Sequence, residues 1–217
     1  MSSPPAVPLA LLLGPPGAGK STQARRVAAR LGWFALDFGH VVRGEVAART
    51  PLGERVLAHR RARGEGPRPP GAWLPDDLVR DLLAAPLAAA QARGGLISDG
   101  YPRRRDQAET FAAPPWRIVA ALHLVVPAAE RERRLRERVI DLASGQIDRR
   151  AAQPTWDQRP EDAVPATLAS RLADWDQDTL PLLEAYRAQG ALVELDGTGD
   201  EALVTERVLA VLQERSA

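Results

Sequence analysis

Eight consecutive residues have the types and spacing that could bind phosphate. The segment Gly14-Pro15-Pro16-Gly17-Ala18-Gly19-Lys20-Ser21 matches the pattern G-x-x-x-x-G-K-[ST] in full. Its glycines allow backbone N–H groups to converge on an anion, and a helix that follows would add the positive end of its dipole. The Lys20 ammonium could then reach the outer phosphates of a triphosphate, and the Ser21 hydroxyl could bind Mg²⁺.

Lys20 is also the only lysine of the chain, because every other Lys or Arg position holds an arginine. A compact ammonium and a planar guanidinium are not interchangeable where a cation must sit among phosphates. The single lysine therefore agrees with a phosphate-binding role for this segment.

A second acidic element is expected near the metal. The apolar run Leu96-Ile97-Ser98 ends in Asp99 and resembles a Walker B strand, whose carboxylate binds Mg²⁺ directly or through water. Many strands also end in an aspartate that caps a turn. The run by itself leaves both interpretations open.

Alternating strands and helices must position these residues. Apolar runs predict strands at 7–13, 34–36, 96–98, 118–126 and 191–195. Helical spacing predicts helices at 21–31, 40–49, 52–63, 76–93, 128–140, 168–187 and 201–214, and Pro86 should kink or break the fourth of these. Loops are expected at 64–71 and 141–163. This order predicts an α/β fold: a central parallel five-stranded sheet with helices on both faces and ligands at the carboxyl ends of the strands.

Composition limits the class of protein. The chain has 217 residues, of which 45% are hydrophobic and 26% charged, which suits a single domain over 1–217. A net charge of +1 gives no reason to expect nucleic-acid or membrane-surface binding. The absence of cysteine excludes disulfides and a cysteine zinc site. Residues 1–8 carry no basic residue and the run 7–13 is too short to span a bilayer, so we expect a cytoplasmic protein. We also expect the protein to be a monomer.

Further segments resemble the adenylate kinase family. Asp99-Gly100-Tyr101-Pro102-Arg103, followed by Gln107, is similar to the D-G-[FY]-P-R…Q segment of these enzymes. The segments 40–46, 50–53 and 71–79 resemble the monophosphate-binding part of the family, and Asp196-Gly197-Thr198 resembles its adenine-side loop. The segments occur in family order over nearly the whole chain, so the joint match is more specific than any one of them.

The resemblance implies a three-layer P-loop kinase fold with two small insertions, a monophosphate-binding lobe at 37–75 and a lid at 141–163. It implies transfer of phosphate from ATP to a nucleoside monophosphate, first of all AMP, with Mg²⁺ as cofactor and without zinc. ATP would be bound by Gly14, Pro15, Gly17, Ala18, Gly19, Lys20, Ser21, Thr22, Arg138 and Gly197. The monophosphate would be bound by Phe38, Gly39, Arg43, Trp73, Leu74, Gly100, Arg103 and Gln107. Mg²⁺ would be held by Ser21 and Asp99. Catalysis would depend on Lys20, Arg103, Arg159 and Arg171, with Arg149 or Arg150 as a further lid arginine.

Elementary chemistry agrees with this assignment of arginines. Transfer between two nucleotides gathers many negative charges, so several cations must converge on the site. The planar fork of a guanidinium suits bidentate contact with phosphate.

One segment departs from the family pattern. The family usually has S-T-G-D where this chain has Asp37-Phe38-Gly39-His40. Phe38 could stack on a base or pack into the core, and His40 is expected at a helix start or facing solvent. Trp73 adds bulk near the expected base pocket. These differences leave the identity of the acceptor base open.

Several other residues are expected to have structural roles. The charged stretch 131–138 is interpreted as a solvated helix face, His59 as solvated, His123 as a strand residue without chemistry, and Trp175 as core. Two alternative functions stay open. One is a kinase of a small-molecule hydroxyl, which would need Asp37 or Asp99 as a base; the other is a nucleotide-binding regulator without transfer activity.

Overall fold

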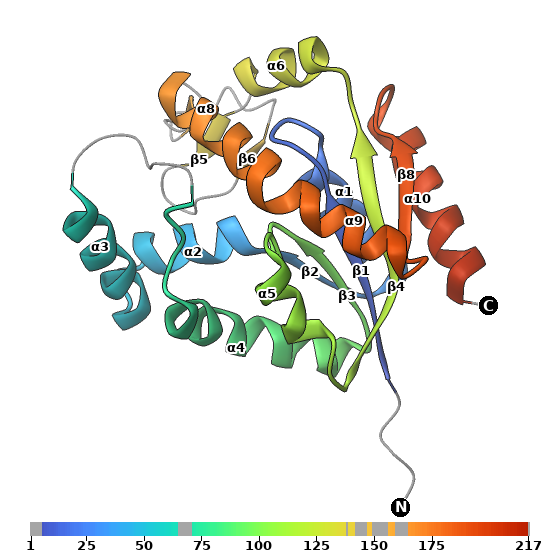
Figure 1. Ribbon diagram of the computed structural model, residues 1–217, viewed down its shortest axis with the longest axis horizontal. Coiled ribbons are helices and arrows are strands. Elements are labelled where there is room, and N and C mark those ends of the chain that lie inside the picture. The colour runs from blue at the N-terminus through green and yellow to red at the C-terminus, as the bar shows by residue number, and fades with distance from the viewer. Residues whose placement is uncertain are drawn as a thin grey trace, which may run out of the picture.

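The computed structural model describes residues 6–64, 71–137, 139–141, 147–148, 156–158 and 165–216. Its centre is a sheet of five parallel strands in the order β2-β3-β1-β4-β8 (Figure 1). The strands are β1 Val7–Leu13, β2 Phe34–Asp37, β3 Leu96–Asp99, β4 Trp116–Val125 and β8 Leu192–Asp196. All five predicted strands are confirmed, with ends that differ by two residues at most.

The helices surround this sheet. They are α1 Lys20–Leu31, α2 Phe38–Ala47, α3 Pro51–Arg63, α4 Asp76–Arg93, α5 Arg105–Ala108, α6 Ala128–Arg136, α8 Pro165–Asp174, α9 Leu180–Ala188 and α10 Glu201–Ser216, with a 3₁₀ turn at Glu109–Phe111. A π-helical turn at Trp175–Thr179 joins α8 to α9, so the helix predicted at 168–187 is one helical rod with a π turn inside it. Such turns are frequent at functional sites.

Strand β1 shows how the layers form, because successive side chains of a strand face opposite sides of the sheet. Leu9 and Leu11 belong to a buried cluster with α4 and α9, whereas Ala10 and Leu12 belong to a cluster with α1 and α10. Helices therefore cover both faces of the sheet (Figure 1). The sheet and the helices on its two faces form the three-layer α/β arrangement that the sequence predicts.

Helices α2 and α3 form a small lobe beside this core. Val42 of α2 and Val56 of α3 pack with Leu78 and Leu82 of α4 in a buried cluster of their own. The two helices approach so closely that a Cβ at Gly53 would lie 2.0 Å from the carbonyl oxygen of Glu45. The lobe is thus held by a cluster that it shares with α4, and at Gly53 the backbones of α2 and α3 are in direct contact.

One local prediction was wrong, and of the two outcomes expected for Pro86, a kink or a break, the break does not occur. Helix α6 ends at Arg136, and Val139 and Ile140 lie in strand β5 Val139–Asp141, which pairs antiparallel with β6 Ile147–Asp148 and β7 Trp156–Gln158. β-Branched residues favour a strand over a helix end, which accounts for the earlier stop. Pro86 does not break α4, because alanines around it are strong helix formers and Leu82, Leu83 and Ala90 are buried against the core. Within the described residues, no helix is both long and apolar enough to span a membrane.

Candidate active site

The glycine-rich turn connects the carboxyl end of β1 to α1. Gly17 and Gly19 have φ angles of 85° and 92°, a left-handed conformation that favours glycine. A Cβ at Gly17 would lie 2.7 Å from the carbonyl oxygen of Arg131, so the turn packs directly against α6. Lys20 is the first residue of α1, and its Nζ donates a hydrogen bond to the carbonyl of Pro15, 3.1 Å away. The ammonium group therefore lies against the inside of the turn.

Asp99 and Ser21 meet beside this turn. Asp99 ends β3 and pairs in register with Leu12 of β1, and its carboxylate accepts a hydrogen bond from the Ser21 hydroxyl. Burial raises the pKa of Asp99, while the nearby Lys20 ammonium opposes the rise. Asp37 ends β2 opposite Asp99. Burial also acts to raise its pKa, but Arg43 and the His40 backbone N–H outweigh this effect, and the pKa of Asp37 falls below its ordinary value.

These oxygens suit Mg²⁺, a hard cation that usually keeps several waters and binds one or two carboxylates together with substrate phosphates. Ser21 and Asp99 supply a hydroxyl and a carboxylate at one point of the sheet edge. The described residues contain no group of three His, Asp or Glu side chains placed to hold a metal by themselves. The fit is therefore to a metal that arrives with a nucleotide rather than to one in an all-protein site.

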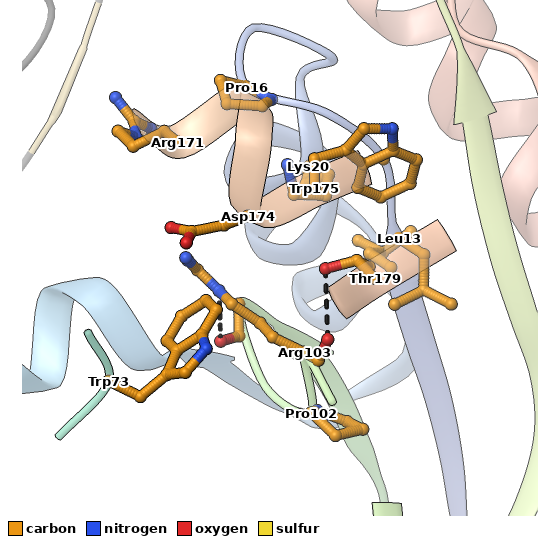
Figure 2. Close-up of a pocket in the computed structure, with 13 residues that line it drawn as sticks. Leu13, Pro16, Lys20, Trp73, Pro102, Arg103, Arg171, Asp174, Trp175 and Thr179 are labelled. Atoms are coloured by element: carbon orange, nitrogen blue, oxygen red, sulfur yellow. Dashed lines mark hydrogen bonds between the residues drawn. The ribbon is translucent and has the colours of Figure 1, made fainter. Parts of the chain in front are cut away.

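A small cavity of ≈ 60 Å³ opens above the glycine-rich turn (Figure 2). Lys20 lines it from α1, Arg103 from the loop after β3, and Arg171 from α8. Arg103 is held firmly, because its Nε donates to the carbonyl of Gly100 at 3.0 Å and its backbone N–H donates to Oε1 of Gln107 at 2.9 Å. Three cationic side chains from separate parts of the chain thus surround one cavity.

A second, larger cavity of ≈ 390 Å³ adjoins the first. All eight residues predicted to bind a monophosphate line it: Phe38, Gly39, Arg43, Trp73, Leu74, Gly100, Arg103 and Gln107. The two cavities share Trp73, Gly100, Arg103 and Arg171. A group that fills the larger cavity therefore reaches the same guanidinium groups as a group bound above the glycine-rich turn.

The residues that depart from the family pattern lie at the wall of this second cavity. Phe38 packs against the ring of Tyr101, with centroids 5.7 Å apart, and also lines the cavity, so its packing role is seen and stacking on a base stays a prediction. His40 is exposed in the first turn of α2, where its backbone N–H donates to Asp37 at 2.8 Å. Arg43 is largely buried, with an Nη 3.9 Å from the Asp37 carboxylate.

The structure refines or corrects three expectations about structural residues. His59, expected to be solvated, is partly exposed and lines the larger cavity together with Arg60 and Arg63 of the same helix. Trp175, expected in the core, packs against the buried cluster that contains β1 and α9. It also lines the smaller cavity and stacks on His123 of β4, with ring centroids 5.5 Å apart.

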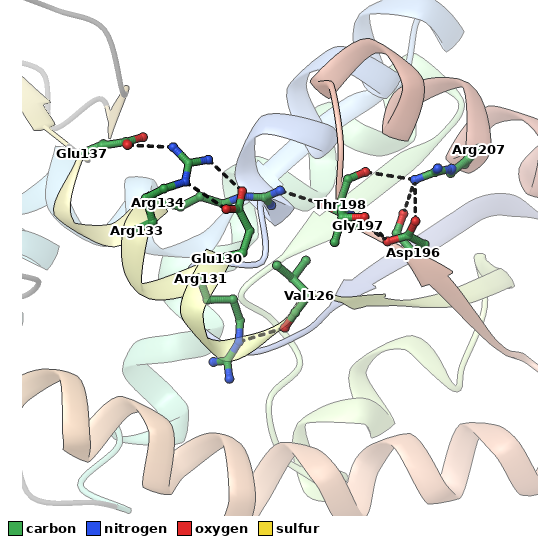
Figure 3. Close-up of polar contacts among 10 residues, drawn as sticks. All are labelled: Val126, Glu130, Arg131, Arg133, Arg134, Glu137, Asp196, Gly197, Thr198 and Arg207. Carbon is green, nitrogen blue, oxygen red and sulfur yellow. Dashed lines mark hydrogen bonds and ion pairs between the residues drawn. The ribbon is translucent and has the colours of Figure 1, made fainter.

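The third expectation, that Arg134 lies on a solvated face, was wrong. Only 6% of it is exposed, and it lines a third cavity together with Gly19 and Thr22. Its Nη2 donates to the carbonyl of Gly197 at 3.1 Å, and its Nε donates to Glu130 at 2.8 Å (Figure 3). The signal in the sequence was its place in the last turn of the helix that follows β4, the strand next to β1. Arg138, Arg149, Arg150 and Arg159 lie outside the described residues.

Comparisons with known proteins agree with this geometry. The adenylate kinase family profile matches residues 12–191. An adenylate kinase of Agrobacterium fabrum is 34% identical over 212 residues, covering 95% of this chain and 98% of that protein. An adenylate kinase of Xanthobacter autotrophicus is 33% identical over 208 residues, covering 94% and 97%, and one of Clavibacter michiganensis subsp. michiganensis is 34% identical over 209 residues, covering 94% and 92%. With its phosphate turn, its two adjoining cavities and these relatives, the chain belongs to the adenylate kinase family of nucleoside monophosphate kinases.

Proposed function

We propose that this enzyme transfers the γ-phosphoryl group of MgATP to a nucleoside monophosphate, with AMP as the first acceptor, in the reaction ATP + NMP = ADP + NDP. The observation that carries the proposal is the pair of adjoining cavities that share Arg103 and Arg171. One cavity contains Lys20 and the phosphate turn, so it suits the donor. The other is large enough for a nucleoside and lies next to Arg43, so it suits the acceptor.

On the donor side, the phosphate turn would hold the triphosphate and Lys20 would neutralise its outer phosphates. Arg134, Gly19 and Gly197 line a cavity on the other side of the turn, where the nucleoside end of ATP would lie. Ser21 and Asp99 would hold the Mg²⁺ of MgATP, which would supply positive charge to neutralise the phosphates.

On the acceptor side, the guanidinium groups of Arg43 and Arg103 would bind the phosphate of the monophosphate. An oxygen of that phosphate attacks the γ-phosphorus, the bond from this phosphorus to the β–γ bridging oxygen breaks, and ADP leaves. The acceptor is already an anion, so this step needs no general base. Positioning and neutralisation of charge by Lys20, Arg103 and Arg171 would supply the rate.

The two insertions would control access to the cavities. We infer that 37–75 acts as the acceptor lobe, because α2 and α3 have their own buried cluster. We also infer that 141–163 acts as a lid, supported by the small antiparallel sheet of β5, β6 and β7. Lid closure would exclude water and suppress hydrolysis of ATP.

A coupled assay of ADP release with AMP, CMP, UMP, GMP and dTMP tests the proposal. We expect ADP release that depends on a monophosphate, is fastest with AMP, and stops when EDTA removes Mg²⁺. Lys20→Met serves as the inactive control. Absence of turnover with all five acceptors at high enzyme concentration contradicts the proposal, and ADP release that needs no acceptor would indicate hydrolysis instead.

A further inference from the structure

Trp73 lies where the two cavities meet, and its indole ring is hydrogen-bonded to a residue that lines neither cavity. Its indole Nε1 donates a hydrogen bond to Oδ2 of Asp178, at 3.0 Å. Asp178 belongs to the π turn between α8 and α9 and is half-buried. Within the described residues Trp73 lines both cavities, whereas Asp178 lines neither of them. The carboxylate therefore contacts the wall of the site through the indole ring.

The ring of Trp73 in turn contacts the guanidinium group of Arg103. The Arg103 guanidinium carbon lies 5.7 Å from the centroid of this ring, within the range of a cation–π contact (Figure 2). The Nε of the same guanidinium is bound to the carbonyl of Gly100. The hydrogen bond at one edge and the ring against the face both constrain the plane of the guanidinium. The position of the indole ring is thus one of the contacts that set its orientation.

The same helical rod holds the backbone next to Trp73. The backbone N–H of Gly71 donates to Oδ1 of Asp174, at 2.8 Å, and Asp174 is buried. Asp174 and Asp178 are four residues apart and so lie on one face of the rod. Thr179 of this π turn also donates, at 3.2 Å, to the backbone carbonyl of Arg103. The π turn and its flanking residue therefore fix three points around the acceptor site.

We propose that Asp178 is a positioning residue for the acceptor: by holding the Trp73 indole, it orients the Arg103 guanidinium toward the phosphate that is to be phosphorylated. The inference rests on the proposed function, because it assigns the acceptor to the larger cavity. Asp178 touches no reacting group in this arrangement. Its loss is expected to weaken acceptor binding and to leave ATP binding unchanged.

Four variants test the link. Asp178→Ala removes the acceptor of the indole hydrogen bond, Asp178→Asn keeps an oxygen that can accept it, and Trp73→Phe keeps a ring but loses the donor. Asp176→Ala is the matched control, because Asp176 is an exposed carboxylate on the same π turn. Steady-state KM for the acceptor and for ATP, and AMP binding by calorimetry, are measured for each variant, with thermal melting to confirm folding.

We expect Asp178→Ala and Trp73→Phe each to raise the acceptor KM and the AMP Kd by about 5- to 20-fold, at the low end of the effect of a lost hydrogen bond to a charged group, because the effect reaches the acceptor indirectly. The ATP KM should stay within about twofold, because neither residue lines the cavity beside Gly19 and Arg134 where the nucleoside end of ATP would lie. Asp178→Asn should restore most of the loss, and Asp176→Ala should match the wild type. The double variant Trp73→Phe/Asp178→Ala should be no worse than either single variant.

The idea is overturned if Asp176→Ala has the same effect, if ATP and acceptor KM rise together, or if the two single effects add in the double variant. Failure of the proposed function looks different, because the wild-type enzyme itself would then turn over none of the five monophosphates. Wild-type turnover combined with additive effects would therefore leave the proposed reaction intact and reject only the role of Asp178.

Discussion

The donor and acceptor sides of the site are built in different ways. On the donor side, one continuous strand–turn–helix segment contributes the glycines, Lys20 and Ser21. On the acceptor side, Phe38, Arg43, Trp73 and Arg103 come from three separate stretches of the chain and meet only through tertiary packing. The donor side is a local structure, whereas the acceptor side depends on how helices and loops are held together.

This difference has a consequence for function. A local turn of fixed glycine geometry leaves little room for variation, and it binds a group that every reaction of the family shares. A cavity made of side chains from several segments can be altered by a substitution in one segment without a change in the others. Phe38 and Trp73, which give this cavity a different wall from the family pattern, are two such positions. Changes on the two sides should therefore have separable effects, on ATP and on the acceptor respectively.

The largest effect is expected for Lys20→Met. Removing the ammonium from the phosphate turn should lower kcat on the order of 10³-fold with any acceptor, because a cation placed to face developing charge contributes several kcal/mol to transition-state stabilisation. Arg25→Met, on the exposed face of the same helix, is the matched control and should be nearly unchanged. A similar loss in both variants would point to damage to α1 instead.

The second largest effect is expected for Asp99→Asn. Its kcat should fall by about 10²-fold and the Mg²⁺ concentration for half-maximal rate should rise, because the amide has no negative charge to attract the metal.

The same substitution should also change stability. Burial raises the pKa of Asp99, so its ionised form destabilises the fold at pH values above the ordinary carboxyl pKa, and this destabilisation is smaller in acid. The neutral amide is therefore expected to raise the melting temperature at pH 7. A Mg²⁺ titration and a thermal melt measure the two effects, and an unchanged Mg²⁺ requirement would contradict the metal role.

Arg43→Gln tests the acceptor side alone. Loss of a charge-assisted contact with the monophosphate should raise the acceptor KM by about 10- to 10²-fold and leave the ATP KM unchanged. Arg49→Gln is the control, because Arg49 follows α2 in the same lobe, is exposed and pairs with Glu54 at 3.0 Å. An equal rise of both KM values would show that the two sides are not separable.

Arg134→Gln is the donor-side counterpart of Arg43→Gln, and its expected change in KM is the smallest of the four substitutions. The ATP KM should rise about 10-fold while the acceptor KM stays constant, because this buried guanidinium lines the cavity next to Gly19 and Gly197. Arg133→Gln is the control, since Arg133 is exposed and pairs with Glu130 and Glu137 (Figure 3). Equal effects of the two substitutions on ATP would reject the donor role of Arg134.

The same contrast explains what could be predicted from the sequence. The β1 strand, the phosphate turn and the start of α1 were predicted closely, because local periodicity and one motif determine them. The eight cavity residues on the acceptor side were predicted from a family resemblance, and physical spacing by itself could not bring residues 38, 73 and 103 together. Sequence reasoning had no way to detect the Trp73–Asp178 contact, which joins two side chains 105 positions apart.

The error about Arg134 also has a physical reason. Arg134 lies on a helix whose charged residues alternate, and such a pattern predicts a solvated face. A helix pattern records which faces are apolar, but it does not record that a polar face closes a cavity. The early end of α6 at Arg136 has another cause, since the strand preference of Val139 and Ile140 depends on partners in β6 and β7.

The central claim is that donor and acceptor phosphates meet at shared arginines above Lys20. A bisubstrate analogue with two adenosines joined through five phosphates tests this claim most directly, because it can span both cavities at once. Calorimetric competition should show that it binds at least about 10²-fold more tightly than AMP or ATP alone and displaces both. Binding no tighter than that of ATP, or displacement of ATP without displacement of AMP, would contradict the account.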